Sequence, residues 1–580
     1  QKRIVFNAET IVKNPTNFTS LLRYNSPIVF KDFGNGGTSS ARFRGTSASN
    51  TVVLWNGINI NSVGSGQTDF NSLSANTADQ IIIKSGGSSL QYGSGSIGGA
   101  VHLKDVLTFE PHKDYQFFSS YGSFNTTSNF FKSNYGGGKW AIKVAGVFNK
   151  SNNDYEYIDD RYTDEDGDSW KNENGNYINY GIDFSLGCKF SDVNKIYFYS
   201  TGYYGDRLFS NGLPNPSAGS ERNEDFNQRN LLKWLYKFGG FTQLLNASFI
   251  TQEYRYYADK DAGDFDFGKS QKALLDYSLA YKLSTFWSLK YLMLIESTHG
   301  ETNKIESKVR NAFSYGGIVT FKPSSKLIST LGVRKEYNSD FEVPLSVSLS
   351  GEQKLGGCIW LKANVSANYR VPTYNEMYWP IAGNKDLIPE HSKQGELGVE
   401  LEKYGFKLNA TFFYIKIKDK IIWRPVRNSN LWTPVNLDAA VNKGAELFLS
   451  YSKKINRHSF HFSGNYICTI AKDSETKKQL PYAPIHLMNY TMEYGYKRVK
   501  MYLQDLYQSS VYTNRLALDF YSLAPVRVLN LGVDIAICKN NKKTLVLGGK
   551  VNNFTNELYY FTNLRPMPGR NYAININYKF

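Results

Sequence analysis

Apolar and polar residues alternate along much of the chain in segments of about ten residues. In residues 571–580, NYAININYKF, one face carries Tyr572, Ile574, Ile576, Tyr578 and Phe580, and the other carries small, amide and lysine side chains. The same period of two recurs in Lys139–Phe148 and again in residues 459–466. A period of two is that of a β-strand. One face suits lipid and the other a wet lumen, so the pattern predicts transmembrane strands.

The connections between these segments are polar and unequal in length. Asn152–Asn176 and Ser210–Asn223 are long and rich in Gly, Asn and Asp, as expected of loops on the extracellular side of a barrel. The 473 residues from 108 to 580 would give each strand and its connection about 21 residues in a 22-stranded barrel. We therefore predict an all-β fold with an antiparallel transmembrane barrel of about 22 strands over residues 108–580.

Residues 1–107 have a different pattern. Short apolar runs at Thr51–Trp55 and Gln80–Lys84 lie among Gly- and Ser-rich turns, and a short helix is expected at Thr16–Arg23. Gly93–Gly98 matches a GxGxxG pattern, but a strand follows it, so we interpret it as a structural turn. A wide barrel needs its lumen filled. We predict that residues 1–107 form an α+β plug domain inside it.

Composition narrows the class of protein. Mean hydropathy is −0.43 while aromatic residues make up 15%, and no run approaches the roughly 18 apolar residues of a membrane-spanning helix. The net charge of +16 is spread along the chain, so we expect contact with outer-membrane lipids and no nucleic-acid partner. The four cysteines are far apart, and no catalytic motif stands at usable spacing. We expect no enzyme activity.

Five motifs in order along the chain resemble those of the TonB-dependent outer-membrane receptors. The resemblance covers nearly the whole chain, and the motifs lie at Arg44–Gly57, Ile81–Val101, Tyr369–Gly398, Asn442–Glu446 and Val551–Tyr572. It implies a plugged barrel in the bacterial outer membrane and import powered by the TonB energy-coupling complex. No TonB box is recognisable in Gln1–Thr10, and no signal peptide precedes Gln1, so we expect a mature or trimmed form.

Within that family, Arg44–Leu73 is similar almost position by position to the plug of the cobalamin transporters. Thr163–Gly167, TDEDG, also resembles their calcium-binding loop, which makes Asp164 and Asp166 candidate calcium ligands. Asp168 extends this acidic cluster, but an EF-hand is not satisfied, so further oxygens would have to come from another loop, for which Asp159, Asp160 or Asp206 are candidates. The alternative is a solvated acidic loop tip. No other cofactor is expected.

Two Gly-rich plug loops, Phe33–Ser40 and Asn61–Asp69, are the candidate substrate site, because glycine lets backbone amides approach a ligand closely. The resemblance implies that they contact substrate from below, and the candidate residues are Thr38, Ser39, Ser40, Asn61, Val63, Gly64 and Ser65. Ordinary plug turns are the alternative. Arg44 is expected to be structural, paired with Glu446 or Glu396.

The resemblance therefore predicts TonB-dependent import of cobalamin or a related corrinoid. Two alternatives stay open: a TonB-dependent importer of a ferric siderophore or haem, and a passive porin or surface-binding barrel. Relatives of the cobalamin transporters also carry a substrate-capturing surface lipoprotein as a lid, which makes such a lipoprotein a candidate partner here.

Overall fold

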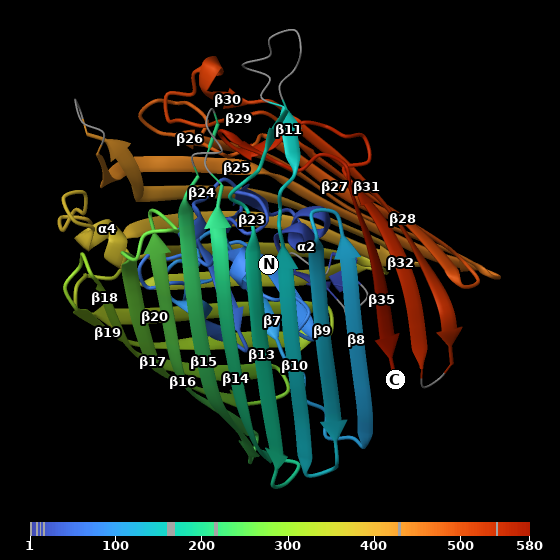
Figure 1. Ribbon diagram of the computed structural model, residues 1–580. Helices are drawn as coiled ribbons and strands as arrows, with labels where there is room; N and C mark the ends of the chain where they lie inside the picture. Colours follow the sequence, from blue (N-terminus) through green and yellow to red (C-terminus); the bar gives the residue numbers. More distant parts are fainter. Residues whose placement is uncertain are drawn as a thin grey trace.

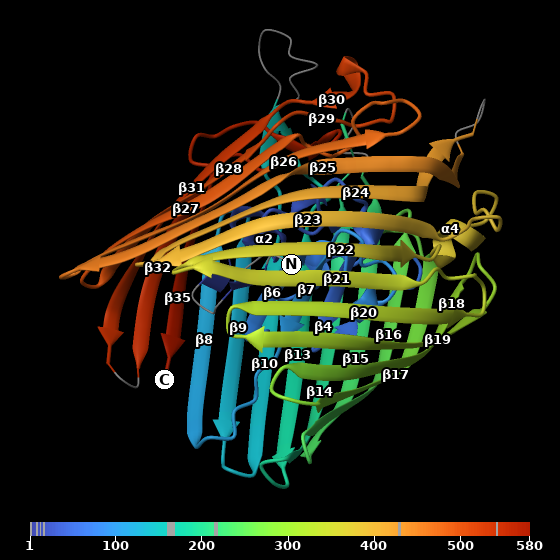
Figure 2. The same ribbon diagram turned by 180° about the vertical axis from the view of Figure 1, so that it is seen from behind.

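The chain folds as a closed barrel of 22 antiparallel strands around an N-terminal domain. The computed structural model describes residues 3–6, 10–11, 13–14, 18–158, 169–210, 212–213, 219–426, 431–540 and 543–580. The plug, blue in Figures 1 and 2, lies inside the ring of strands in both views. The predicted fold class is confirmed. Within the described ranges, no helix is long and apolar enough to cross a membrane.

The barrel strands follow one another around the ring in chain order, and it closes where β35 pairs with β8. They are β8 (His112–Gly122), β9 (Thr126–Gly136), β10 (Trp140–Ser151), β13 (Tyr177–Lys189), β14 (Asn194–Phe209), β15 (Glu221–Phe238), β16 (Phe241–Tyr257), β17 (Asp266–Lys282), β18 (Trp287–Thr302), β19 (Lys308–Ser324), β20 (Leu327–Asn338), β21 (Ser346–Gly356), β22 (Ile359–Arg370), β23 (Glu390–Lys403), β24 (Phe406–Pro425), β25 (Trp432–Ile455), β26 (His458–Asp473), β27 (His486–Tyr496), β28 (Val499–Gln508), β31 (Val526–Lys539), β32 (Thr544–Asn552) and β35 (Asn571–Lys579).

The plug is built on a five-stranded sheet. Its order is β1 (Arg3–Phe6), β6 (Gln80–Ser85), β7 (Gly99–Lys104), β4 (Thr51–Trp55) and β5 (Ile58–Asn59). Helices α2 (Phe18–Asn25) and α3 (Ser89–Tyr92) and the hairpin of β2 (Val29–Asp32) and β3 (Ser39–Arg42) complete it. The predicted helix at 16–23 therefore reaches Asn25, while residues 16 and 17 lie outside the described ranges. The boundary that we place at 107/108 falls between β7 and β8.

The two ends of the barrel differ in the length of their connections. At one end every connection is a turn of two to four residues, whereas at the other end the connections reach the length of residues 152–176 between β10 and β13. That long connection includes the ribbon of β11 (Glu156–Ile158) and β12 (Ser169–Lys171), and the loop after β22 includes helix α4 (Tyr374–Tyr378). Short turns belong to the periplasmic side of such barrels and long loops to the outside. The smaller ribbons β29–β30 (Val511–Tyr512 with Ser522–Leu523) and β33–β34 (Tyr560–Thr562 with Arg565–Pro566) lie at the long-loop end.

On strands β10 and β26, outward apolar and inward polar residues alternate as predicted. On β10, Trp140, Val144 and Phe148 are exposed on the outside, while Lys143 between them is buried against the plug. On β26, Phe460 and Tyr466 are exposed, and Asn465 faces inward and is buried. The outer face is therefore apolar and aromatic, and the inner face carries the polar groups that meet the plug.

Candidate substrate site at the plug apex

The two predicted loops lie at the long-loop end of the lumen, beneath the extracellular connections. The Asn35 carbonyl accepts a hydrogen bond from Asn153 Nδ2 (2.7 Å) in the connection after β10. In the second loop, the Val63 and Gly64 carbonyls accept from the backbone amides of Tyr374 and Asn375, at 3.4 and 3.0 Å. The loops thus form the upper surface of the plug, where a ligand entering from outside would meet it.

The seven predicted contact residues differ in what they present to that surface. Thr38 is exposed, and the four residues Ser40, Val63, Gly64 and Ser65 are half-buried. Ser39 is only 1% exposed, and its hydroxyl accepts from Thr19 Oγ1 (2.8 Å). The first five residues therefore keep part of their surface accessible, whereas the Ser39 side chain packs inside the plug.

Asn61 is also occupied by the plug itself. Its side-chain oxygen accepts from Val53 N (2.9 Å) and Thr68 Oγ1 (3.0 Å). Its amide donates to the carbonyls of Thr51 (2.7 Å) and Gly66 (2.9 Å). All of its side-chain hydrogen-bonding capacity is engaged, so in this structure Asn61 fixes the shape of the second loop.

Asp69, which the sequence reading did not single out, joins the two loops to each other and to the barrel. One carboxylate oxygen accepts from Ser39 N (2.9 Å) and Asn71 N (3.0 Å). The other accepts from Arg207 Nη1 of β14 (2.7 Å), and Arg207 also pairs with Asp225 of β15. An aspartate that ends a Gly-rich loop is common in turns, so nothing in the sequence alone distinguishes this one.

A close approach also fixes the second loop. Gly66 adopts a φ of +69°, and a Cβ at this position would lie 2.5 Å from Thr373 Cγ2 in the loop after β22. Both the backbone conformation and the space therefore require glycine. The loop is seated against the barrel before any substrate arrives.

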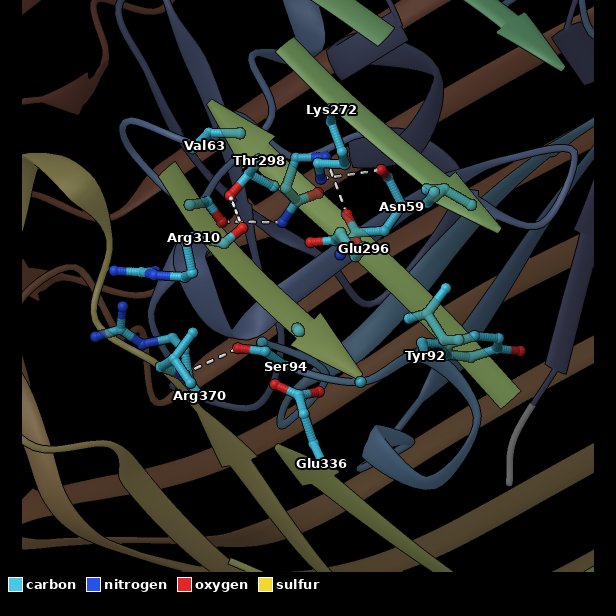
Figure 3. A pocket seen from close by; sticks show the side chains of 18 of the residues that line it. Asn59, Val63, Tyr92, Ser94, Lys272, Glu296, Thr298, Arg310, Glu336 and Arg370 are labelled. Carbon is cyan, nitrogen blue, oxygen red and sulfur yellow. Dashed lines mark hydrogen bonds between the residues drawn. The ribbon is translucent and has the colours of Figure 1, made fainter. Parts of the chain in front are cut away.

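A cavity of about 180 Å³ separates this side of the plug from strands β17–β20 and β22 (Figure 3). Its barrel wall carries both signs of charge, with Lys272, Arg310 and Arg334 alongside Glu296 and Glu336. Arg310 Nη2 and Arg334 Nε are buried and have no hydrogen-bond partner among the described residues. The cavity is therefore a polar space able to take hydrogen-bonding groups.

The cavity is too small to pass a large ligand. Pockets for drug-sized molecules span roughly 300–1,000 Å³. A ligand of that size or larger would dock on the apex and could cross only if the plug moved.

Arg44 anchors the plug to the barrel as predicted, and it contacts both expected carboxylates. Its Nε and Nη2 reach Glu446 at 2.7 and 3.3 Å, and its Nη1 reaches Glu396 at 2.7 Å. The guanidinium also lies 4.6 Å from the centroid of the Phe413 ring. Burial alone would lower the pKa of Arg44, but Glu446 and Glu396 raise it above its usual value, so the residue stays charged.

Two further polar clusters hold other sides of the plug. Asp79 pairs with Lys132 and with Lys143 (3.1 Å), and Lys143 also pairs with Asp105. Burial tends to raise the pKa of Asp79, but the two lysines lower it below its usual value. On another wall, Asn50 Nδ2 donates to Glu390 (2.7 Å), which pairs with Arg370.

The candidate calcium ligands Asp164 and Asp166 lie outside the described residues, as do Asp159, Asp160 and Asp168. Asp206 is described and is held by Arg222, with two bonds of 2.8 Å. Within the part of the chain that the structure describes, no three His, Cys, Asp or Glu side chains gather as a metal site. Calcium binding stays a prediction.

Comparison with known families agrees with the architecture. Residues 110–554 match the family model "TonB dependent receptor-like, beta-barrel", and residues 1–100 match "TonB-dependent Receptor Plug Domain". The chain belongs to the TonB-dependent receptors. It is therefore an outer-membrane protein of a family of receptors and transporters, not enzymes, and the family implies TonB-coupled transport of a substrate.

Several characterised proteins resemble this receptor over nearly its full length. It is 23% identical to the vitamin B12 transporter BtuB of Photobacterium profundum, covering 94% of this chain and 87% of that protein. It is 22% identical to the vitamin B12 transporter BtuB of Vibrio vulnificus (strain YJ016), covering 100% and 92%.

Solved structures of receptors for other cargoes share the fold. The siderophore receptor PirA from Acinetobacter baumannii has a TM-score of 0.82 at 17% identity, covering 100% of this chain and 98% of that one. The FrpB iron transporter from Neisseria meningitidis has a TM-score of 0.83 at 15% identity, covering 99% of each chain. The copper transporter OprC has a TM-score of 0.81 at 14% identity, covering 100% and 99%. Fold similarity thus spans several cargoes.

Proposed function

We propose that this receptor imports cobalamin or a related corrinoid across the bacterial outer membrane, using energy delivered through TonB. The observation that carries the proposal is its similarity, at 22–23% identity over nearly the whole chain, to two vitamin B12 transporters. The plug segment Arg44–Leu73, which includes the second apical loop, is where the sequence resembles cobalamin transporters most closely.

The geometry of the apex supports recognition by polar contacts. Thr38 and Ser65 offer hydroxyl groups, and the Gly-rich backbone around them offers amides and carbonyls. A corrinoid bears many peripheral amide groups, which pair well with such donors and acceptors. Corrinoid would rest on the apex between the extracellular connections.

Import then requires work on the plug. The cavity of about 180 Å³ is far too small for a corrinoid, and the anchors at Arg44, Asp69 and Asp79 hold the plug to several walls. A pull transmitted from TonB to the N-terminal side of the plug would break part of this contact set and open a path. No bond in the substrate changes in this process.

Two additional elements belong to the proposal. Calcium at Asp164 and Asp166 would order the connection after β10 over the bound corrinoid. A surface lipoprotein could close the long-loop end as a lid. Calorimetry with and without a chelator, and a pull-down from solubilised outer membranes, test these two elements separately.

Isothermal titration calorimetry with purified receptor tests the cargo. Cobalamin and cobinamide should bind with submicromolar affinity, while haem and ferric siderophores should not compete. Thr38→Trp and Ser65→Trp should each weaken corrinoid binding at least about tenfold, which corresponds to 1.4 kcal/mol. Ser325→Trp, in the exposed β19–β20 turn at the opposite end of the barrel, is the matched control and should bind normally.

Other results would favour the alternatives. Tight binding of a ferric siderophore or haem with no corrinoid binding would identify a different cargo for the same TonB-dependent transport. Unchanged affinity in both tryptophan variants would reject the apical site while leaving the cargo open. Uptake that survives collapse of the proton-motive force would indicate a passive barrel.

A further inference from the structure

The outer wall of the barrel has a large hollow within its membrane-facing surface. A space of about 970 Å³ lies against β25–β28, β31, β32 and β35, and we call it the lipid-side hollow. Its lining is almost entirely apolar and includes Phe460, Met492, Tyr494, Met501, Val533 and Ile574. Five of these six side chains are exposed on the outer face, with Met501 at 55% and Ile574 at 67%.

A glycine in the wall contributes to the hollow. Gly549 of β32 shares the outer face with Leu547 and Val551, where neighbouring strands carry large side chains. A Cβ at Gly549 would meet only Val533 Cγ1, at 3.9 Å. The absence of a side chain at Gly549 therefore leaves open space, and a larger residue there would fit without a clash.

Exposed cations border the hollow at its short-turn end. Lys453 pairs in register with Phe460, and Arg457 lies in the adjacent β25–β26 turn. Lys497 and Arg498 form the β27–β28 turn, and Lys497 N donates to the Arg457 carbonyl at 3.3 Å, so the two turns touch. Residues 451–462 and 494–503 contain no Asp or Glu. Glu493, the carboxylate in the lining of the hollow, is paired with Lys13 and Lys500 and not with these cations.

We propose that the lipid-side hollow binds an anionic glycerophospholipid of the inner leaflet of the outer membrane. Its acyl chains lie in the apolar hollow, and its phosphate is held by Lys453, Arg457, Lys497 and Arg498. The short-turn end of the barrel faces the periplasm, which places these cations at the headgroup level of that leaflet. Basic side chains near a membrane surface attract anionic headgroups, and arginine suits phosphate particularly well.

Other parts of the wall show the two features separately. Lys282, Lys290 and Lys322 are also exposed near the short turns, on the inner face of β17–β19, and Lys326 lies in the β19–β20 turn. A second apolar hollow, of about 500 Å³, lies around Leu232 and Phe249, part-way up β15 and β16. At β25–β28 a larger hollow and the cations coincide, which is the arrangement that a headgroup with attached chains requires.

Native mass spectrometry tests the proposal on the full-length receptor. The protein is equilibrated with equal amounts of phosphatidylglycerol and phosphatidylethanolamine that carry the same acyl chains, and the retained lipids are counted. We expect phosphatidylglycerol to be retained at least tenfold over phosphatidylethanolamine. A basic side chain at a membrane surface contributes up to about fivefold to the attraction of an anionic lipid, so K453Q/R457Q/K497Q/R498Q should abolish the preference.

Gly549→Phe tests the hollow itself and should lower retention of both lipids at this site. Gly317→Phe on β19 is its control, because a Cβ at Gly317 meets nothing within 4 Å and Gly317 lies on the opposite wall of the barrel. K282Q/K290Q/K322Q/K326Q is the control for charge. Both control variants should retain phosphatidylglycerol as the unmodified receptor does.

Equal retention of the two lipids by the unmodified receptor would overturn the proposal, as would an unchanged preference in the four-cation variant. An equal loss in the charge control would mean that the whole basic rim attracts lipid without a site. A stable dimer that Gly549→Phe disrupts would show that a second copy occupies the hollow instead. Heat-modifiable migration on gels checks that each variant keeps a closed barrel.

Discussion

Removing the Arg44 side chain should release the plug more easily from the barrel. Arg44→Met keeps much of the volume of the side chain and its contact with Phe413, but it takes away the positive charge. Glu446 and Glu396 would then be left facing each other, with 0% and 5% of their side chains exposed. The substitution therefore removes the positive charge from beside two carboxylates that water hardly reaches.

The structure sets the size of the effect. Arg44 makes three N–H···O contacts of 2.7, 2.7 and 3.3 Å to the two carboxylates. Breaking a buried ion pair by removing one partner destabilises by about 3–5 kcal/mol. We expect a loss of this size in the free energy of plug unfolding. The free energy of plug unfolding of Arg44→Lys should lie between those of the unmodified receptor and Arg44→Met, because lysine keeps the charge but cannot form the planar two-bond contact of arginine.

Urea unfolding of the plug within an intact barrel is the assay. The four native cysteines are first replaced by serine. A fluorophore on a cysteine introduced into the plug then reports unfolding. The combined variant Arg44→Met/Glu396→Gln/Glu446→Gln is the decisive companion, because it removes the stranded charges as well. It should regain much of the stability that Arg44→Met loses.

Two results would refute the reasoning. A change below about 1 kcal/mol in Arg44→Met would mean that the contact behaves like a solvent-exposed pair. A combined variant as unstable as Arg44→Met alone would mean that lost packing, and not stranded charge, causes the effect.

The other anchors give further predictions. Lys143 and Lys132 depress the pKa of Asp79, so the stability that this carboxylate contributes is complete above its usual pKa near 3.8 and is lost as the pH falls below that value. Plug unfolding in urea at pH 7, 5 and 3 should show this loss. Asp79→Asn should remove that part of the pH dependence. Asp69→Asn weakens the charge-assisted bond to Arg207 and should raise proteolytic cleavage in the two apical loops several-fold without releasing the plug; uncleaved loops would show that Asp69 is dispensable for their order. Gly66→Leu collides with Thr373 and should lower corrinoid affinity at least about tenfold by displacing the second loop; normal affinity would show that this loop can shift without cost to binding.

The barrel could be predicted from the sequence because its strands alternate with a lipid-facing apolar side. Segments such as residues 571–580 show that pattern directly. The pattern fails where the lumen wall is apolar too. On β24, Phe413, Ile415 and Ile417 are buried against the plug while Phe412 and Tyr414 face outward, so the apolar run Phe412–Ile415 conceals which face is which.

The resemblance placed the two plug loops at the top of the plug, and their contact with substrate stays a prediction. The two loops lie at the apex, yet the burial of Ser39 and Asn61 depends on contacts with Thr19 and Thr51. Contacts between segments far apart in sequence leave no local signal. Arg44 was the exception, because Arg44, Glu396 and Glu446 each lie in one of the family motifs.

The charged lining of the cavity was missed for a related reason. Lys272, Glu296 and Glu336 each lie singly on the inner face of a strand, where any polar residue satisfies the alternation. Their convergence on one cavity is set by the register of β17 to β20, which the sequence pattern does not specify. A charged residue in a lumen position flanked by outward apolar residues is the signal that could have marked them.

Uptake of radiolabelled cyanocobalamin tests the central claim most directly. It would be measured in cells that lack any other corrinoid receptor and express this one, with and without a protonophore. The account predicts saturable accumulation that the protonophore abolishes, while binding at the cell surface persists. Accumulation that continues without the proton-motive force, or no corrinoid binding at all, would contradict it.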